Sequence, residues 1–199
     1  MERGAASIVT DPYDHRAIGY EALKLRADIV TISHDAPGHN FSSAVKRYSH
    51  LLDGPGEYEI GGVFITAVRT NGGKSENERP RNTLYVFDFD GIKVAHLGDI
   101  NAVPRRSQID ALGEVNVVLM PVGAGNGLNA AKAAEVVSIL EPNIVIPMHY
   151  QTPDLKLSLE PLDKFIKEMG LGDIETEPSL KVTSHSLPEE TCVVVLDYQ

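Results

Sequence analysis

Four residues that can hold a metal ion each come after a short apolar run in the sequence, and they are His34, His39, Asp99 and His149. The first two flank the turn Asp35-Ala-Pro-Gly, and the other two follow separate runs rich in valine and isoleucine. In α/β proteins, sites form where strands end and the chain turns. We therefore expect the four side chains to converge in one cleft at the ends of strands.

Charge and composition restrict the partners of the chain. The formal net charge is −10, and phosphate binding needs clustered lysine and arginine, so we expect no nucleic-acid partner. No apolar stretch is long enough to span a membrane, and the start does not resemble a signal peptide. The single cysteine, Cys192, forms no internal disulfide and suits a reducing compartment. The expectation is a cytoplasmic protein with one domain over residues 1–199.

Strand and helix patterns alternate irregularly along the chain. Valine- and isoleucine-rich runs predict strands at Ala6–Val9, Ile29–Ser33, Val63–Val68, Thr83–Phe89, Ile92–Leu97, Val115–Met120, Ile144–Met148 and Val193–Tyr198. Helices are predicted at Ala17–Leu25, Arg105–Ala111, Ala130–Leu140 and Leu159–Met169. Asp90-Gly91 predicts a two-residue hairpin, and Thr70–Arg81 reads as a long polar loop. Hairpins mixed with strand–helix units indicate two mixed sheets packed face to face with helices outside.

Several short motifs occur in an order that resembles the metallo-β-lactamase-fold hydrolases, in the branch that carries a Gly-Pro-Gly-Glu-Tyr-Glu turn. They are Thr10-Asp-Pro12, Asp28–His34, Gly54–Glu59, Asn82–Tyr85, His96–Asp99, Pro121–Gly123 and Ile146–Tyr150. The resemblance covers nearly the whole chain. It implies an α/β fold of the αββα type, a sandwich of two mixed β-sheets with outer helices. Relatives begin with two further strands, so either the fold is shortened at its N-terminus or the sequence starts downstream of the native start.

The resemblance also implies a set of metal ligands, with gaps. His34 matches the first histidine of the family's His-x-His-x-Asp-His cassette and His39 matches the last, whereas Ala36 and Gly38 replace the ligands between them. Asp99 matches the bridging aspartate and His149 the terminal histidine. A further histidine usually follows the strand equivalent to Val63–Val68, and Arg69–Gly73 contains none.

This ligand count predicts at most one ion, zinc or another divalent metal, and an empty pocket is the alternative. The first family site keeps only His34 and a share of Asp99, and two protein ligands rarely hold zinc. The second keeps His39, Asp99 and His149, the ligand number of a catalytic zinc centre with an open position. Asp99 and His34 are the expected catalytic residues. His96 is expected to pack beside the site, and His15, His50 and His185 to be exposed or structural.

The leading functional prediction is a metal-dependent-hydrolase homologue whose catalysis is weakened or lost. The alternatives are a working one-metal hydrolase that uses His39, Asp99 and His149, with His34 in proton transfer, and a non-catalytic binding or assembly protein. Nucleotide binding through the glycine-rich Val122–Gly127 is a weaker reading, because Leu128 stands where a third glycine belongs. The substrate is expected to be a small molecule that the sequence does not identify. Because of the short start, we expect an uncovered sheet edge at Ala6–Thr10 and self-association into a homo-oligomer there.

Overall fold

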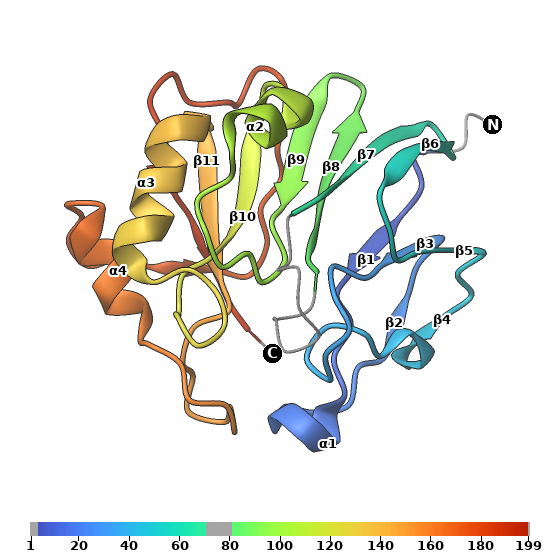
Figure 1. The fold of residues 1–199 in the computed structure, drawn as a ribbon, viewed down its shortest axis with the longest axis horizontal. Coiled ribbons are helices and arrows are strands. Elements are labelled where there is room, and N and C mark those ends of the chain that lie inside the picture. The colour runs from blue at the N-terminus through green and yellow to red at the C-terminus, as the bar shows by residue number, and fades with distance from the viewer. Residues whose placement is uncertain (1–3, 71–80, 199) are drawn as a thin grey trace.

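Two β-sheets pack face to face in the computed structural model, which describes residues 4–70 and 81–198 (Figure 1). The larger sheet has seven strands in the order β13-β11-β10-β9-β8-β7-β6. Strands β6 to β9 form an antiparallel meander, and β10, β11 and β13 continue it with parallel pairing. Its strands are β6 (Gly56–Ile60), β7 (Val63–Arg69), β8 (Thr83–Phe89), β9 (Ile92–His96), β10 (Val117–Pro121), β11 (Ile144–Met148) and β13 (Cys192–Val193).

The smaller sheet has three parallel strands in the order β1-β3-β5, where β1 is Ile8–Thr10, β3 is Ile29–Thr31 and β5 is His50–Leu52. Two short pairs complete the described strands. They are β2 (Leu25–Arg26) with β4 (Val45–Lys46), and β12 (Thr176–Glu177) with β14 (Val195–Leu196). The predicted α/β fold class is confirmed, although only the larger sheet is mixed and the described strands of the smaller sheet are all parallel.

An apolar layer lies between the two sheets because alternate residues of each strand point inward. Ile29 and Leu52 of the smaller sheet belong to one buried cluster with Ile65 of β7 and Tyr85 of β8. The Tyr85 hydroxyl lies 2.9 Å from the carbonyl oxygen of Ile32 and 3.0 Å from that of Leu52. This buried tyrosine therefore links the larger sheet to the ends of two strands in the smaller one.

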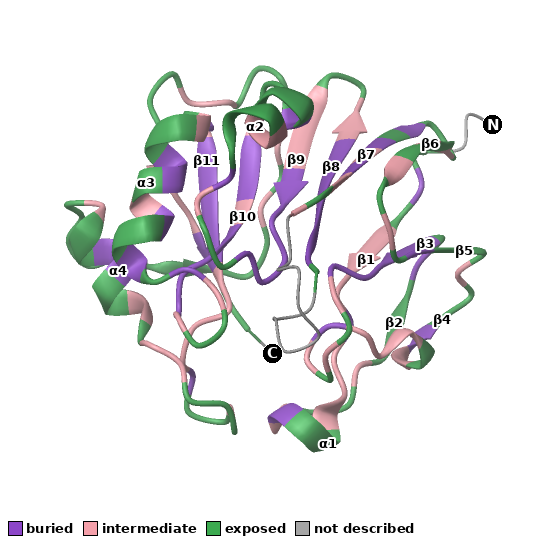
Figure 2. Ribbon diagram, in the orientation of Figure 1, coloured by how far each residue is buried: buried purple, intermediate pink, exposed green. Residues whose placement is uncertain are grey.

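Three helices cover the outer face of the larger sheet, as Figures 1 and 2 show. They are α2 (Arg106–Leu112), α3 (Ala130–Leu140) and α4 (Leu162–Glu168). Helix α3 has the predicted bounds, and its Asn129 cap accepts a hydrogen bond from the backbone N–H of Lys132. The buried face of α3 packs into the same cluster as Phe165 of α4. This helix layer therefore buries one face of strands β8 to β11.

The outer layer on the smaller sheet differs from the prediction. A helix was expected at Ala17–Leu25, but α1 spans only His15–Ile18. Gly19 ends it with a φ of 104°, and a Cβ at Gly19 would collide with the backbone oxygen of Asp154, so the chain must leave the helix there. The short 3₁₀ turn η1 (Ser42–Ala44) and the β2–β4 pair provide the remaining cover.

Other elements follow the predictions with shifted ends. The Asp90-Gly91 turn has φ values of 53° and 90°, as a type I′ hairpin requires. The strand expected at Val193–Tyr198 is instead divided into β13 and β14, which pair in different sheets. Helix α4 begins after Pro161, later than predicted. Residues 71–80 of the predicted polar loop lie outside the described residues.

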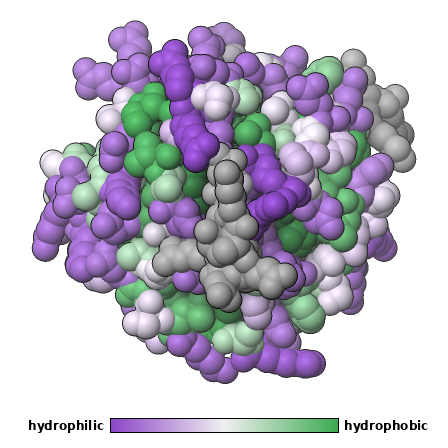
Figure 3. All heavy atoms as spheres, in the orientation of Figure 1, coloured by the Kyte–Doolittle hydropathy of each residue, from purple (hydrophilic) through white to green (hydrophobic). Residues whose placement is uncertain are grey.

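The periphery of the face in Figure 3 is mainly hydrophilic, and hydrophobic residues gather nearer its centre. Within the described ranges, no helix is both long and apolar enough to cross a membrane.

Candidate metal centre

The four sequence-predicted residues line one cleft of about 620 Å³. His34 and His39 come from the turn after β3, Asp99 follows β9, and His149 follows β11. The ring centroids of His34 and His39 are 4.1 Å apart, and those of His39 and His149 are 5.4 Å apart. The two sheets thus bring together side chains that are up to 115 positions apart in the sequence (149 minus 34).

Three of these residues form a group that fits one metal ion. Ligand atoms of His39, Asp99 and His149 all lie within 4.8 Å of one another. Asp99 Oδ1 and His149 Nδ1 are 3.8 Å apart, and neither has a hydrogen-bond partner within residues 4–70 and 81–198. Buried polar atoms almost always have a partner, and a divalent cation would provide one for both. The donor set of two imidazoles and one carboxylate suits zinc and related metals.

The loop that presents Asp99 is shaped by a glycine and an asparagine. Gly98 has a φ of 60°, and a Cβ there would collide with the side chains of Asn82 and Ser33. The Asn82 amide donates to the carbonyl oxygen of Leu97 at 2.9 Å, and its oxygen accepts from the backbone N–H of Asp99 at 3.0 Å. Asn82 therefore holds both sides of the turn and fixes the direction of Asp99.

His149 has a backbone conformation that non-glycine residues rarely adopt, with a φ of 54°. Gly123 packs against its carbonyl, where a Cβ would collide with the His149 oxygen. Gly127 of the same loop approaches the Asp99 carboxylate just as closely. The glycines that suggested a nucleotide loop thus have another explanation, since they let backbone pack against two candidate ligands.

Sequence reasoning missed Asp11, which it treated as part of a turn. Asp11 directly follows β1, and its side chain is only 7% exposed. Its carboxylate accepts hydrogen bonds from the backbone N–H and hydroxyl of Ser33 and from His39 Nδ1, the last at 2.8 Å. Asp11, His34 and His39 also form a group of possible ligands within 4.8 Å. The signal was available, because a carboxylate after an apolar run is the same pattern that singled out Asp99.

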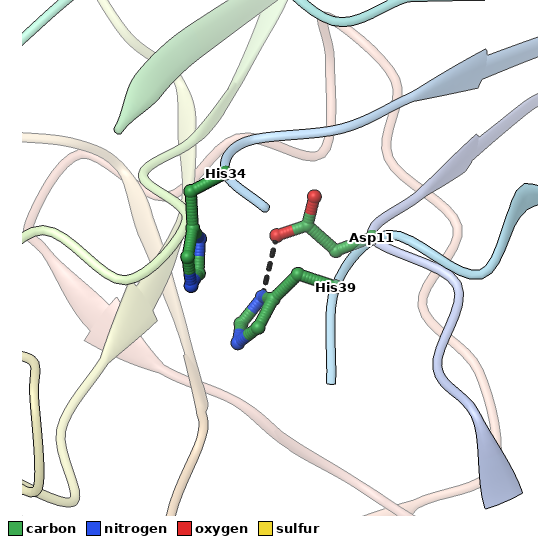
Figure 4. A group of neighbouring side chains, drawn as sticks. All are labelled: Asp11, His34 and His39. Atoms are coloured by element: carbon green, nitrogen blue, oxygen red, sulfur yellow. Dashed lines mark hydrogen bonds and ion pairs between the residues drawn. The ribbon is translucent and has the colours of Figure 1, made fainter. Parts of the chain in front are cut away.

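The hydrogen bonds around Asp11 place a proton on Nδ1 of two histidines, and Figure 4 shows the one between His39 and Asp11. An ionised carboxylate only accepts, so His39 Nδ1 carries the proton that it donates to Asp11. The Ser33 hydroxyl donates its one proton to Asp11, so it accepts from His34 Nδ1 at 3.0 Å. In the neutral form of each ring the proton is therefore on Nδ1, which leaves Nε2 as the atom that could bind a metal or accept a proton.

Burial dominates the electrostatics of the site. It lowers the pKa of His34 to about 4, with nearby His39 adding to the effect, and it also lowers the pKa of His149. Burial alone would raise the pKa of Asp11, but interactions with His96, His39 and Ser33 outweigh it, so this pKa is lowered. His34 and His149 are thus held neutral and Asp11 ionised near neutral pH.

His96, which was expected to pack beside the site, lies in β9 and is buried. Its Nε2 is 3.9 Å from Asp11 Oδ2. Among the others, His50 is exposed, whereas His15 is half-buried and contacts Asp14.

Ala36 and Gly38, which stand at the two positions of the cassette without a ligand, both line the cleft. Gly38 does not need a left-handed backbone, and a Cβ there would meet only Ile18 Cγ2, at an ordinary 3.7 Å. Ala36 and Gly38 therefore leave space that larger ligand side chains could fill. The third gap was placed at Arg69–Gly73, and residues 71–73 lie outside the described ranges.

Comparison with known proteins agrees with this geometry. A sequence model described as the beta-lactamase superfamily domain matches residues 1–149. The chain is 26% identical to a UPF0173 metal-dependent hydrolase of Thermococcus onnurineus, over 82% of this chain and 86% of the relative. It is 32% identical to another from Archaeoglobus fulgidus, over 69% and 64% of the two chains.

Solved structures show the same relationship. A structure from Thermotoga maritima, described as a Zn-dependent hydrolase of the metallo-β-lactamase superfamily, is 35% identical, with a TM-score of 0.74 over 96% of this chain and 90% of that one. A metal-dependent hydrolase from Parabacteroides distasonis shares the fold at 18% identity and a TM-score of 0.60, over 96% and 85% of the two chains. The protein belongs to the β-lactamase superfamily and resembles its metal-dependent hydrolases.

Proposed function

We propose that this protein is a hydrolase whose centre holds one divalent metal ion through His39, Asp99 and His149. Its catalysis is weaker than a complete two-ion cassette would support, because Ala36 and Gly38 contribute no ligands. The observation that carries the proposal is the pair of buried atoms without partners, Asp99 Oδ1 and His149 Nδ1, at 3.8 Å.

The residues divide the chemistry between them. An ion at this position would act as a Lewis acid that lowers the pKa of water and polarises the scissile group. Asp11 orients His39 toward this ion through a hydrogen bond. Asp99 would supply a negative charge beside His149. Asp99 thus takes the role in the reaction that the sequence predicted for it.

His34 is proposed to transfer a proton. It is neutral near pH 7, its Nδ1 is held by Ser33, and its Nε2 is free to accept a proton from the attacking water. A pKa of about 4 makes it a weak base, so we expect slow rather than fast hydrolysis.

Elemental analysis of purified, zinc-equilibrated protein tests the proposal, together with hydrolysis of a reactive p-nitrophenyl ester. We expect close to one zinc per chain and slow turnover that chelation abolishes. His34→Asn should slow turnover but leave zinc content unchanged, which separates the proton-transfer role from metal binding. No bound metal in the folded protein would instead support a binding or assembly protein, and two ions per chain would refute the one-ion centre.

A further inference from the structure

A second cavity of about 390 Å³ opens beside the metal centre, and His39 and His149 line both spaces. Its wall includes Leu119 of β10, Ile146 of β11 and Leu196 of β14. These strand residues face away from the cluster that packs under the helices. We call this cavity the apolar pocket. Because His39 and His149 line both spaces, a molecule in the apolar pocket would lie against the proposed reaction site.

Four tyrosines line the pocket, and they are Tyr13, Tyr20, Tyr150 and Tyr198. Tyr20 lies edge-on to Tyr13 at 5.6 Å and tilted to Tyr198 at 6.2 Å. The Tyr20 hydroxyl is 2.6 Å from Thr152 Oγ1, and the Tyr13 hydroxyl donates to the carbonyl oxygen of Glu21. Because the hydroxyls of Tyr13 and Tyr20 already have partners, these two rings present mainly carbon surface.

The pocket also lacks the charges that an anionic ligand would need. Among the described residues that line it, none is lysine, arginine or glutamate, and Asp11 is the one carboxylate. The oxygens of Asp11 are occupied by Ser33 and His39. A phosphate placed here would lose hydration and meet no lysine or arginine in the described lining, whereas a hydrocarbon chain would lose unfavourable contact with water.

We propose that the apolar pocket binds an uncharged aliphatic or aryl group of the substrate, so that the substrate is a carboxylic ester, thioester or lactone with an apolar acyl group. This assignment rests on the proposed hydrolase function. The volume falls in the range of small-molecule pockets that are mostly apolar with a few placed polar groups. In hydrolysis, the water oxygen would bond to the carbonyl carbon, the bond to the leaving oxygen or sulfur would break, and a proton would go to the leaving group.

Binding of straight-chain alcohols tests the pocket without requiring turnover. Titration calorimetry with 1-butanol, 1-hexanol and 1-octanol should show affinity rising roughly fourfold for each added methylene while the pocket fills. Leu119→Trp, which places a large ring in the pocket, should weaken 1-octanol binding at least tenfold. Leu171→Trp is the matched control, because Leu171 is 41% exposed and does not line the pocket, and it should bind as the parent does.

A second variant keeps the test valid if Leu119→Trp fails to fold. Leu157 is 41% exposed on a loop at the pocket, so Leu157→Arg should fold, and its charge should weaken 1-octanol binding several-fold. Affinity that does not depend on chain length, or equal affinity in these variants and the parent, would overturn the assignment. A dimer that Leu119→Trp dissociates would also overturn it, because a second copy would then cover the pocket.

Hydrolysis assays separate this inference from the proposed function. With zinc-loaded protein, kcat/KM for p-nitrophenyl esters should rise from acetate to octanoate and exceed that for bis-p-nitrophenyl phosphate. Ester hydrolysis without chain-length dependence would leave the hydrolase function standing and refute the pocket assignment. Chain-length-dependent alcohol binding without hydrolysis of any ester would support an apolar-ligand pocket and refute the hydrolase function.

Discussion

The two halves of the candidate centre differ in how their polar atoms are satisfied. Both carboxylate oxygens of Asp11 accept hydrogen bonds, from Ser33 and His39, and the Ser33 hydroxyl extends this network to His34 Nδ1. Around Asp99 and His149, two buried atoms face each other at 3.8 Å with no partner in the described chain. We therefore expect the ion to bind in the second half, where it would provide a partner for both atoms, and the first half to orient His39.

The largest expected effect is the difference in zinc affinity between the Asp99→Asn and Asp11→Asn variants. Asp99→Asn removes a ligand charge and should weaken zinc binding by more than about 100-fold, whereas the matched Asp11→Asn disturbs an orienting contact and should cost roughly 10–100-fold. Zinc titration of both variants measures this. An equal or greater loss in Asp11→Asn would mean that Asp11 is itself a ligand and that the halves have been assigned the wrong way round.

Stability of the metal-free protein should show the reverse order. Asp11→Asn places an amide against the N–H of His39 and the hydroxyl of Ser33, so we expect a loss of about 2–3 kcal/mol. Asp99→Asn removes a buried charge without a partner and should change stability by less than about 1 kcal/mol, in either direction. Urea unfolding in a chelator provides both values. Similar losses in the two variants would remove the distinction between a satisfied and an unsatisfied half.

Restoring the missing ligands should strengthen the half that needs the ion. Ala36→His with Gly38→Asp adds a carboxylate beside His39, and the backbone at Gly38 accepts a side chain without strain. Zinc should then bind at least about tenfold more tightly, since a direct ligand should contribute no less than an orienting partner. The added substitution His39→Ala should abolish the gain. If zinc affinity is unchanged in the folded double variant, the cassette positions have been misplaced.

The smallest expected effect is self-association at the edge of the smaller sheet. Strand β1 lies at one end of the order β1-β3-β5, so one side of Ile8–Thr10 is available for pairing. The strand is three residues long and Pro12 follows soon after it, so we expect only weak dimers. Sedimentation velocity over a concentration series should show slow growth of a dimer peak. A clean monomer throughout the micromolar range would end this proposal.

Strongly periodic elements could be predicted from the sequence. Helix α3 has its expected bounds because Asn129 caps it and its apolar spacing is regular, and the Asp90-Gly91 hairpin follows from its turn chemistry. The helix expected at Ala17–Leu25 failed because a local apolar pattern does not reveal that Gly19 must pack against the Asp154 backbone. Such a contact, between residues 135 positions apart (154 minus 19), is visible only in three dimensions.

The candidate centre was likewise only partly predictable from the sequence. His34, His39, Asp99 and His149 could be proposed because each follows a strand, and the structure places all four in one cleft. Their role as ligands remains a prediction. Asp11 was overlooked because Asp-Pro reads as a turn, and its importance depends on contacts with Ser33 and His39 from a different strand. The orphaned state of Asp99 Oδ1 likewise depends on tertiary packing, which spacing alone does not encode.

The most direct test of the one-ion centre is anomalous scattering at the zinc edge from crystals of the zinc-loaded protein. We predict a single peak within about 2.0–2.2 Å of an Asp99 carboxylate oxygen and of ligand nitrogens of His39 and His149. A peak held by Asp11 and His34, or two peaks of equal height, would contradict the account.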